Sequence, residues 1–231
     1  MKTVFEDDNE YLCDIQAPCF LELLPEEIKL VQSGRTQVLF RRGESLTKQG
    51  TFASYVLFIV TGYSRQYIEG EGQRDYNMRI IKPGEFLGLS AVFSGNTFNY
   101  STVALTDCRA FLIEKQAIAT LSKQNGNFGF SIIRRYCELN TRLFQSLNSV
   151  IFHQMNGRLA ETLLYIDGFK KENPEIFQLL SRKELADFAG ISMESGVKLL
   201  KNFEKDGLID LYEKDIKIVD YVKLAEIARR G

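Results

Sequence analysis

The chain has 231 residues, which is enough for one large domain or for two modest domains with separate cores. Its 29 Lys and Arg residues nearly balance 30 Asp and Glu residues, and the net charge of −1 excludes a bulk polycation that coats nucleic acid non-specifically. No apolar run approaches the ~20 residues of a membrane span, and the acidic N-terminus lacks an apolar signal core. These features predict a cytoplasmic protein without a membrane partner.

Four cysteines and a single histidine limit metal and redox chemistry. Cys13, Cys19, Cys108 and Cys137 form no CxxC motif, and their spacing is wider than that of most iron–sulfur sites. Reduced thiols are usual in cytosolic proteins, so the sequence predicts no metal site and no cofactor. An iron–sulfur or redox role for Cys13, Cys19 and Cys108 stays open as an alternative.

The first half of the chain predicts a short helix followed by an antiparallel β-structure. In residues 10–33, Pro25 is placed at a helix start and is followed by two carboxylates. Residues 38–113 contain short Val-, Ile- and Tyr-rich runs broken by turns about every ten residues, as in a sandwich or barrel. This half contains no nucleophile–base pair and no clustered His and carboxylate ligands, so we expect no catalytic residues and no cupin-type oxygenase.

A long helix is predicted for residues 127–153, because apolar residues recur there in steps of three and four. The apolar stripe is wider than one neighbour requires, so one edge is expected to cover the β-structure and the other to pair with a second copy. The alternative is a core helix of a monomer. The residues expected in the dimer contact are Tyr136, Leu139, Leu143, Leu147 and Val150.

After a break at residues 153–157, Asn156 is expected to cap a helix that ends before Gly168. The segment 181–203 then predicts two short helices joined by a tight turn. Ser181 has capping-box spacing to Glu184, and Gly190 suits the left-handed end of the first helix. Ser192 is expected to cap the second helix. This is the helix-turn-helix pattern, whose second helix enters the DNA major groove.

The second helix is expected to expose a polar side and to bury an inner side formed by Val197, Leu199, Leu200 and Phe203. One residue argues against the pattern, because Gly196 stands where an apolar packing residue is usual, at a cost of ~1 kcal/mol relative to alanine. Residues 204–220 predict a hairpin that forms a wing, and residues 222–230 predict a closing helix. The residues expected on the outer side are Met193, Glu194, Ser195, Lys198 and Lys201.

Over residues 20–225, the order of these elements resembles the Crp/Fnr family of bacterial transcription regulators. Five short motifs in the same order carry the resemblance: FRRGE at 40–44, IVTG at 59–62, KPGEFLG at 82–88, ALTDC at 104–108 and NGRLAETLL at 156–164. The resemblance implies a homodimer paired along the long helix, with its two recognition helices one DNA turn apart on a palindromic site. It also implies a hinge near residues 154–156.

The family pattern implies particular DNA contacts for this chain. Ser181, Lys183 and Ser192 fall at positions that touch phosphates, with Ser195 and Lys201 on the same outer side. Glu194 matches a residue that accepts a hydrogen bond from cytosine N4. Lys198 stands where arginine usually reads guanine, so base discrimination there is expected to be softer, and Met193 is suited only to apolar contact with a thymine methyl group.

The effector pocket departs from the family pattern. Cyclic-AMP-binding members carry a Gly-Glu pair followed by an Arg-Ser pair, where this chain has Gly88-Leu89-Ser90 and Phe98-Asn99-Tyr100. Leucine cannot hydrogen-bond a ribose, and a buried cyclic phosphate without arginine would lack charge compensation. We therefore expect no cyclic AMP binding of the usual kind, and either an unidentified effector or none. Arg79 is the nearest candidate cation.

The sequence thus predicts an α+β protein that is not an enzyme. Its parts are an N-terminal antiparallel, cupin-like β-barrel (double-stranded β-helix) sensor at 1–125, a dimerisation helix at 126–153 and a winged helix-turn-helix domain at 154–231. The expected partners are double-stranded DNA, a second copy and, for an activator, RNA polymerase. The alternative is a sensor of the same type whose C-terminal domain docks a protein.

Overall fold

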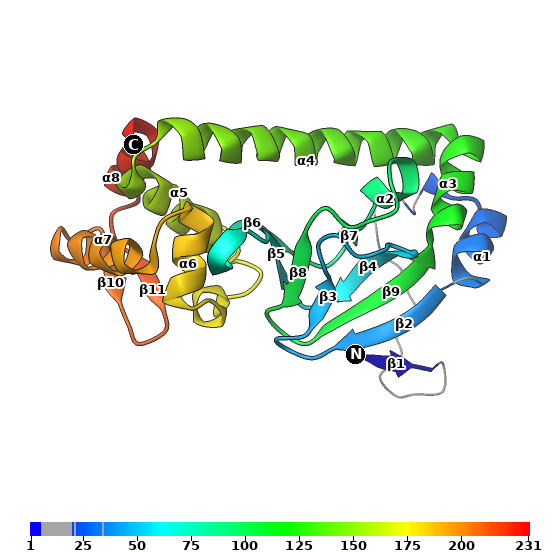
Figure 1. The fold of residues 1–231 in the computed structure, drawn as a ribbon, viewed down its shortest axis with the longest axis horizontal. Coiled ribbons are helices and arrows are strands. Elements are labelled where there is room, and N and C mark those ends of the chain that lie inside the picture. The colour runs from blue at the N-terminus through cyan, green and yellow to red at the C-terminus, as the bar shows by residue number, and fades with distance from the viewer. Residues whose placement is uncertain (6–19, 21, 34) are drawn as a thin grey trace. The chain divides into compact units, whose positions relative to one another are not determined.

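The computed structural model describes residues 1–5, 20, 22–33 and 35–231, and the chain divides into two compact units. Figure 1 labels their helices and strands. The sheet unit comprises Met1–Ile68 and Arg79–Thr141, and the helical unit comprises Glu69–Met78 and Arg142–Gly231. None of the helices in the described ranges is both long and apolar enough to cross a membrane.

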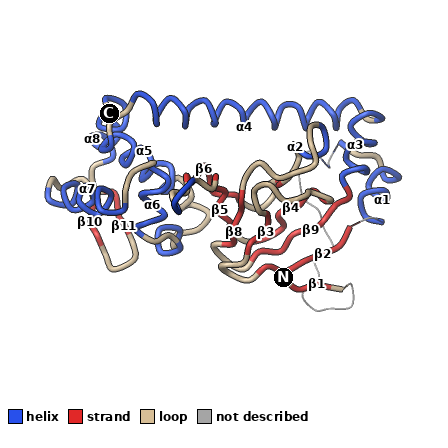
Figure 2. Tube along the Cα trace, viewed as in Figure 1, coloured by secondary structure: helices blue, strands red, loops and turns tan. Residues whose placement is uncertain are grey.

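The described strands of the sheet unit form two β-sheets, drawn in red in Figure 2. The five-stranded sheet has the order β1-β2-β9-β4-β7, and the four-stranded sheet has the order β3-β8-β5-β6. Their bounds are β1 Lys2–Val4, β2 Arg35–Phe40, β3 Ser45–Thr47, β4 Tyr55–Thr61, β5 Ser64–Ile68, β6 Tyr76–Ile81, β7 Phe86–Leu87, β8 Ser101–Ala104 and β9 Cys108–Glu114.

The predicted α+β class is confirmed, but the strands do not form a closed barrel. Closing a barrel requires hydrogen bonds all the way around the sheet. Strand β7 has two residues and β3 has three, so neither continues the pairing across a corner. The described strands therefore remain two separate sheets.

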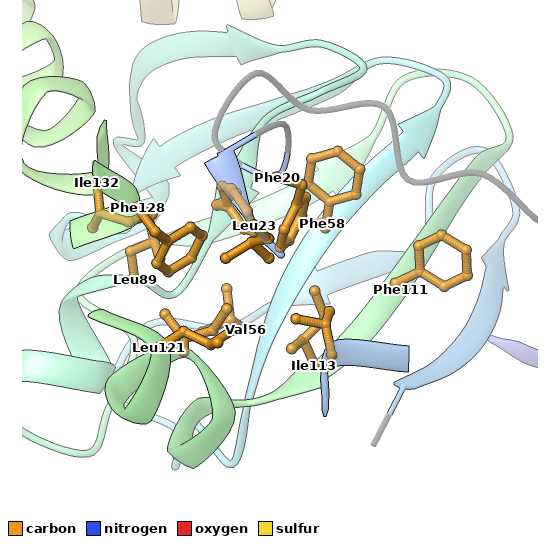
Figure 3. Close-up of a cluster of buried hydrophobic side chains, with 13 residues drawn as sticks. Phe20, Leu23, Val56, Phe58, Leu89, Phe111, Ile113, Leu121, Phe128 and Ile132 are labelled. Carbon is orange, nitrogen blue, oxygen red and sulfur yellow. The ribbon is translucent and has the colours of Figure 1, made fainter. Parts of the chain in front are cut away.

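Both faces of the central strand β4 are buried. Val56 and Phe58 pack into one apolar cluster, whereas Leu57 and Ile59 pack into another that contains residues from both sheets. Figure 3 shows the first cluster, in which strand residues meet Phe20, Leu23 and the helices that follow β9. A strand buried on both faces needs apolar residues at successive positions, which explains the continuous apolar run in β4.

Among the residues that the structure describes, four α-helices begin in the sheet unit. Their bounds are α1 Pro25–Ser33, α2 Ser90–Phe93, α3 Lys115–Gln124 and α4 Gly126–Phe152. Helix α1 begins at Pro25, as predicted, and α4 matches the predicted long helix to within a residue at each end. The start of α4 is anchored by Phe128 and Ile132, which are buried in the cluster of Figure 3.

The helical unit follows the predicted order. It contains α5 Met155–Asp167, a short 3₁₀ turn η3 at Ile176–Leu179, α6 Arg182–Ala189, α7 Met193–Lys205, the antiparallel pair β10 Ile209–Leu211 and β11 Ile216–Ile218, and α8 Tyr221–Arg230. The loop between β5 and β6 belongs to this unit, and it includes the short 3₁₀ turn η2 at Glu71–Gln73.

The start of α5 differs from the prediction. Its N-cap is Gln154, whereas the expected cap, Asn156, lies inside the first turn. The backbone N–H of Gln154 donates to the carbonyl oxygen of Gly231, which follows α8. A tertiary contact with a distant segment, rather than a local side-chain cap, therefore fixes where α5 begins.

Gly196 also has a role that the sequence pattern did not predict. It is buried in α7, where an added Cβ would lie 3.0 Å from the Cβ of Ala186 in α6. The two helices approach closely at this point, and a larger residue would push them apart. The glycine is therefore part of the packing of the helix-turn-helix.

Candidate nucleic-acid interface

The start of α6 has the predicted capping box. The Ser181 hydroxyl accepts a hydrogen bond from the Glu184 N–H at 3.1 Å, and the Glu184 carboxylate accepts from the Ser181 N–H at 2.7 Å. These bonds satisfy N–H groups that have no partner within the helix. The Ser181 hydroxyl is also the group that is predicted to touch a DNA phosphate. Because the cap already holds Ser181, the position of its backbone is fixed without DNA.

The turn between the two helices is fixed from two sides. Gly190 has φ of 61°, the left-handed conformation that ends α6. A guanidinium nitrogen of Arg158 in α5 donates to the Gly190 carbonyl at 3.2 Å. Helix α5 therefore helps to hold the turn, a role for Arg158 that no local sequence pattern indicates.

Helix α7 packs through part of its predicted inner side. Leu200 and Phe203 are buried, while Val197 and Leu199 are half-buried. The Ser192 hydroxyl accepts from the Ser195 N–H at 3.2 Å, as expected for an N-cap. Because its own cap and packing hold α7, the outer side of this helix is left accessible.

The outer side of α7 presents one acidic and several basic groups. Met193, Glu194, Lys198 and Lys201 are exposed, as predicted, while Ser195 is half-buried beside the cap. Lys205 is also exposed and lies one turn beyond Lys201, so it extends the same basic row. The prediction missed Lys205, although its spacing of four from Lys201 could have indicated it.

The Glu194 carboxylate is held in its ionised form. Its pKa lies below the ordinary value, because its own backbone N–H and then the Ser192 hydroxyl donate hydrogen bonds to it. An ionised carboxylate at the first turn also interacts favourably with the helix dipole. Glu194 is therefore a hydrogen-bond acceptor at neutral pH, the property that contact with cytosine N4 requires.

Two cations near the start of α6 already have partners. The Lys183 ammonium lies 2.8 Å from the Asp187 carboxylate, one turn further along α6. The half-buried Arg182 guanidinium donates to the Tyr212 carbonyl of the wing at 3.4 Å. Burial lowers the pKa of Arg182, while the negative charges of Asp215 and Glu204 oppose that shift. The prediction missed this connection, because it depends on where the wing folds back.

The predicted dimer contact is largely exposed in the single chain. Exposed fractions run from 39% at Val150 to 51% at Leu147, and Tyr136 and Leu143 fall between them, whereas Leu139 is half-buried. Further exposed apolar residues of α4 are Phe130, Ile133, Phe144, Ile151 and Phe152. Helix α4 thus has nine exposed large apolar or aromatic side chains, and such an exposed apolar surface is typical of an interaction site.

The residues of the predicted effector pocket do not all meet. Leu89 is buried in the cluster of Figure 3, beside Phe128 and Ile132. Phe98 is instead buried in the second cluster, which contains residues from both sheets, and Tyr100 packs against that second cluster. Asn99 is exposed, and the half-buried Ser90 begins α2. Gly88, Phe98 and Tyr100 therefore meet, whereas the Leu89 side chain packs into a different core.

Arg79 does not offer a free cation to this region. Its side chain is only 11% exposed and forms an ion pair with Glu85, which is 13% exposed. Its Nε also donates to the Gln66 side-chain oxygen at 2.8 Å. The sequence named Arg79 as the nearest candidate cation for the pocket, but the structure covers this side chain and compensates its charge with Glu85.

The residues placed by the structure contain no group of three or more His, Cys, Asp or Glu that could hold a metal ion. Cys108 is buried and Cys137 is exposed. Cys13 and Cys19 lie outside the described residues, so the iron–sulfur alternative stays a prediction.

Fold and site together define a class: a sheet domain followed by a long helix and a helix-turn-helix with a wing. The sequence model of the cyclic nucleotide-binding domain matches residues 37–125, and that of the Crp-like helix-turn-helix domain matches residues 157–227. The chain belongs to the Crp/Fnr family of transcription regulators. The resemblance read from the sequence is thereby confirmed.

Individual relatives agree with this assignment. The chain is 23% identical over 218 residues to the CRP-like cAMP-activated global transcriptional regulator of Mycobacterium tuberculosis, a match covering 93% of this chain and 97% of that protein. A Crp/Fnr-family regulator structure from Eubacterium rectale superposes with a TM-score of 0.76 at 17% identity, covering 92% and 98% of the two chains. The c-di-GMP responsive regulator CLP of Xanthomonas campestris gives a TM-score of 0.73 at 18% identity, covering 84% and 99%. These relatives are transcription regulators rather than enzymes, in agreement with the prediction, and a Crp-like helix-turn-helix binds DNA.

Proposed function

We propose that the protein regulates transcription as a homodimer bound to a palindromic DNA site. The observation that carries this proposal is the outer side of α7, where Glu194, Lys198 and Lys201 are exposed on a helix that is already capped and packed. Two such helices in a two-fold dimer would enter successive major grooves about 34 Å apart. The division into parts at 1–125, 126–153 and 154–231 belongs to the same proposal.

Each outer residue has an assigned contact in this proposal. Glu194 accepts from cytosine N4, and Lys198 donates to guanine O6 or N7 with less discrimination than arginine. Met193 touches a thymine methyl group. Ser181, Lys183, Ser192, Ser195 and Lys201 contact the phosphates or the groove edge. A DNA-bound regulator works in the cytoplasm, and RNA polymerase is its partner if it activates.

The dimer contact runs along the exposed apolar stripe of α4. Leu147→Glu should convert the dimer to a monomer in sedimentation velocity, because the new charge would be buried at the contact. DNA affinity should fall about a hundredfold, since the two half-sites no longer act together. Gln145→Glu adds the same charge at another exposed position of α4, and it should leave the protein dimeric. A Leu147→Glu protein that stays dimeric would refute this dimer contact.

The experiment that tests the function is selection of bound sequences from random duplex DNA, with purified protein and no added ligand. We expect a two-fold symmetric motif with half-sites about one turn apart. Affinity should fall steeply with salt, because phosphate contacts release counterions. No enrichment, with or without cyclic nucleotides, would contradict the proposal.

The proposal also concerns the effector, because we expect that the protein does not bind cyclic AMP in the way that is usual for the family. The apolar Leu89, which is buried in one core, and the covered Arg79, which is paired with Glu85, support this. Neither side chain offers a ribose acceptor or a free charge to a cyclic nucleotide. Calorimetric binding of cyclic AMP at micromolar concentration would overturn it. A brown anaerobic preparation containing iron and sulfide would favour the iron–sulfur alternative instead.

A further inference from the structure

We propose that the side chain of Tyr100 occupies the sheet unit as an internal substitute for a small-molecule effector. This inference rests on the proposed function, because it concerns how the regulator is set. It concerns the segment Gly84–Gly88, which includes β7, and the groups that hold this segment in place. All of these groups belong to the sheet unit.

The phenol of Tyr100 satisfies a backbone group at the centre of the expected pocket. Its oxygen accepts a hydrogen bond from the Gly88 N–H at 2.8 Å. Gly88 has φ of 83°, and an added Cβ would lie 2.8 Å from the ring of Phe98. The space beside Gly88 is therefore filled by the chain's own aromatic groups, and its amide already has an acceptor.

The charged groups near this segment are also satisfied internally. Glu85, the second residue of the segment, pairs with Arg79, and Arg79 is held by Gln66. An entering anion would have to compete with a carboxylate that is already nearly covered. The ion pair therefore holds the segment near its start, at Glu85, while Tyr100 holds it at its end, at Gly88.

Helix α4 contacts the same segment. A guanidinium nitrogen of Arg135 donates to the Gly84 carbonyl at 2.8 Å, and the guanidinium carbon lies 5.5 Å from the centre of the Phe86 ring. The helix that carries the proposed dimer contact thus docks on a segment fixed from inside by Tyr100 and Glu85. An effector that fixed this segment from outside would be redundant.

The first test uses the unmodified protein. Its melting temperature and its affinity for the selected DNA should stay unchanged with millimolar cyclic AMP, cyclic GMP or cyclic di-GMP, because a ligand that binds only the folded state raises its stability. A clear rise in melting temperature together with a tenfold or larger gain in DNA affinity, for any of these ligands, would overturn the inference.

The second test removes the internal group and replaces it from solution. Tyr100→Ala should weaken DNA binding about tenfold, within the range usual for coupling between two sites. Adding 4-methylphenol should restore the melting temperature and the affinity, because the ring refills the cavity and the hydroxyl again accepts from Gly88. Toluene, which lacks the hydroxyl, should restore less.

Tyr67→Ala is the matched control, since Tyr67 is another half-buried tyrosine of the sheet unit. Its melting temperature should not respond to 4-methylphenol. An equal response in both variants, or full DNA affinity of Tyr100→Ala without additive, would refute the inference. The melting temperature is measured without DNA, so the two proposals can fail separately. If the protein bound no DNA, but 4-methylphenol still raised the melting temperature of Tyr100→Ala and not that of Tyr67→Ala, the proposed function would be overturned. The conclusion that Tyr100 fills the sheet unit would then still stand.

Discussion

In the sheet unit, Arg79 and Glu85 meet where both side chains are nearly covered. In the helical unit, Lys183 and Asp187 form a second pair, in which the aspartate side chain is 12% exposed but the lysine side chain is 50% exposed. Charges removed from water are costly unless they remain paired, whereas an ammonium group half in water can exchange one anionic partner for another at little cost. The first pair therefore fixes structure, whereas the second leaves Lys183 able to exchange Asp187 for a phosphate in the proposed DNA complex.

The same contrast separates two ionisable groups. Burial raises the pKa of the Cys108 thiol to about 12 in the sheet unit, and Asp107 adds to the rise. Hydrogen bonds lower the pKa of Glu194 in the helical unit. The interior of the sheet unit therefore keeps the Cys108 thiol neutral, whereas the surface of the helical unit keeps the Glu194 carboxylate charged.

The largest expected effect concerns thiol chemistry. At pH 8, with a pKa of about 12, only about one Cys108 in ten thousand is a thiolate, so alkylation should be at least about a thousandfold slower than at the exposed Cys137. Mass spectrometry of the labelled peptides separates the four cysteines. Equal labelling rates at Cys108 and Cys137 would show that the interior opens readily.

The sign of the stability effect follows from the same shift. The raised pKa means that the folded state retains the Cys108 proton more strongly than the unfolded state, whose reference value is 9.0. The contribution to stability is full below pH 9 and is lost as the pH rises toward 12. Cys108→Ala should remove this contribution to the loss of folding stability at alkaline pH, as measured by urea titration between pH 8 and pH 11.

The next largest effect is expected from Glu85→Gln. This change leaves the Arg79 charge nearly covered and unpaired, so the free energy of unfolding should fall by about 3 kcal/mol in urea titration. Glu114→Gln makes the same change at an exposed residue of the sheet unit and should have little effect. A double change, Arg79→Met with Glu85→Met, should recover much of the loss. A loss no larger than that of Glu114→Gln would break the comparison.

Two glycines sharpen the comparison through packing. Gly88→Ala combines a positive φ with contact against Phe98, so it should destabilise the protein by about 2 kcal/mol. Gly196→Ala meets Ala186 at 3.0 Å but gains helix propensity worth ~1 kcal/mol, so the two effects should nearly cancel. Thermal unfolding measures both variants. A larger loss from Gly196→Ala than from Gly88→Ala would reverse the expectation.

The smallest effect is expected from Asp187→Asn. Releasing Lys183 should raise DNA affinity about twofold, in keeping with the modest strength of exposed ion pairs. Fluorescence anisotropy at several salt concentrations would measure it. Glu175→Gln removes one negative charge at an exposed position between α5 and η3, so it controls for the change in net charge. An equal gain in both variants would show that Lys183 has no specific part.

The sequence alone determined the helix-turn-helix. Ser181, Glu184, Gly190 and Ser192 act through hydrogen bonds and backbone angles within a few residues, and such local signals are readable in the sequence. The long apolar period of α4 was readable for the same reason. The resemblance to the family then followed from short motifs in their order.

Only the tertiary structure decided how distant residues meet. The strands form two sheets, Leu89 and Phe98 belong to different cores, and Arg79 turns inward to Glu85 rather than toward solvent. Gln154 rather than Asn156 is the N-cap of α5, because the Gln154 N–H donates to the carbonyl oxygen of the distant Gly231. Each of these outcomes depends on which surfaces pack together, and packing free energies depend on contacts between segments that no local period encodes.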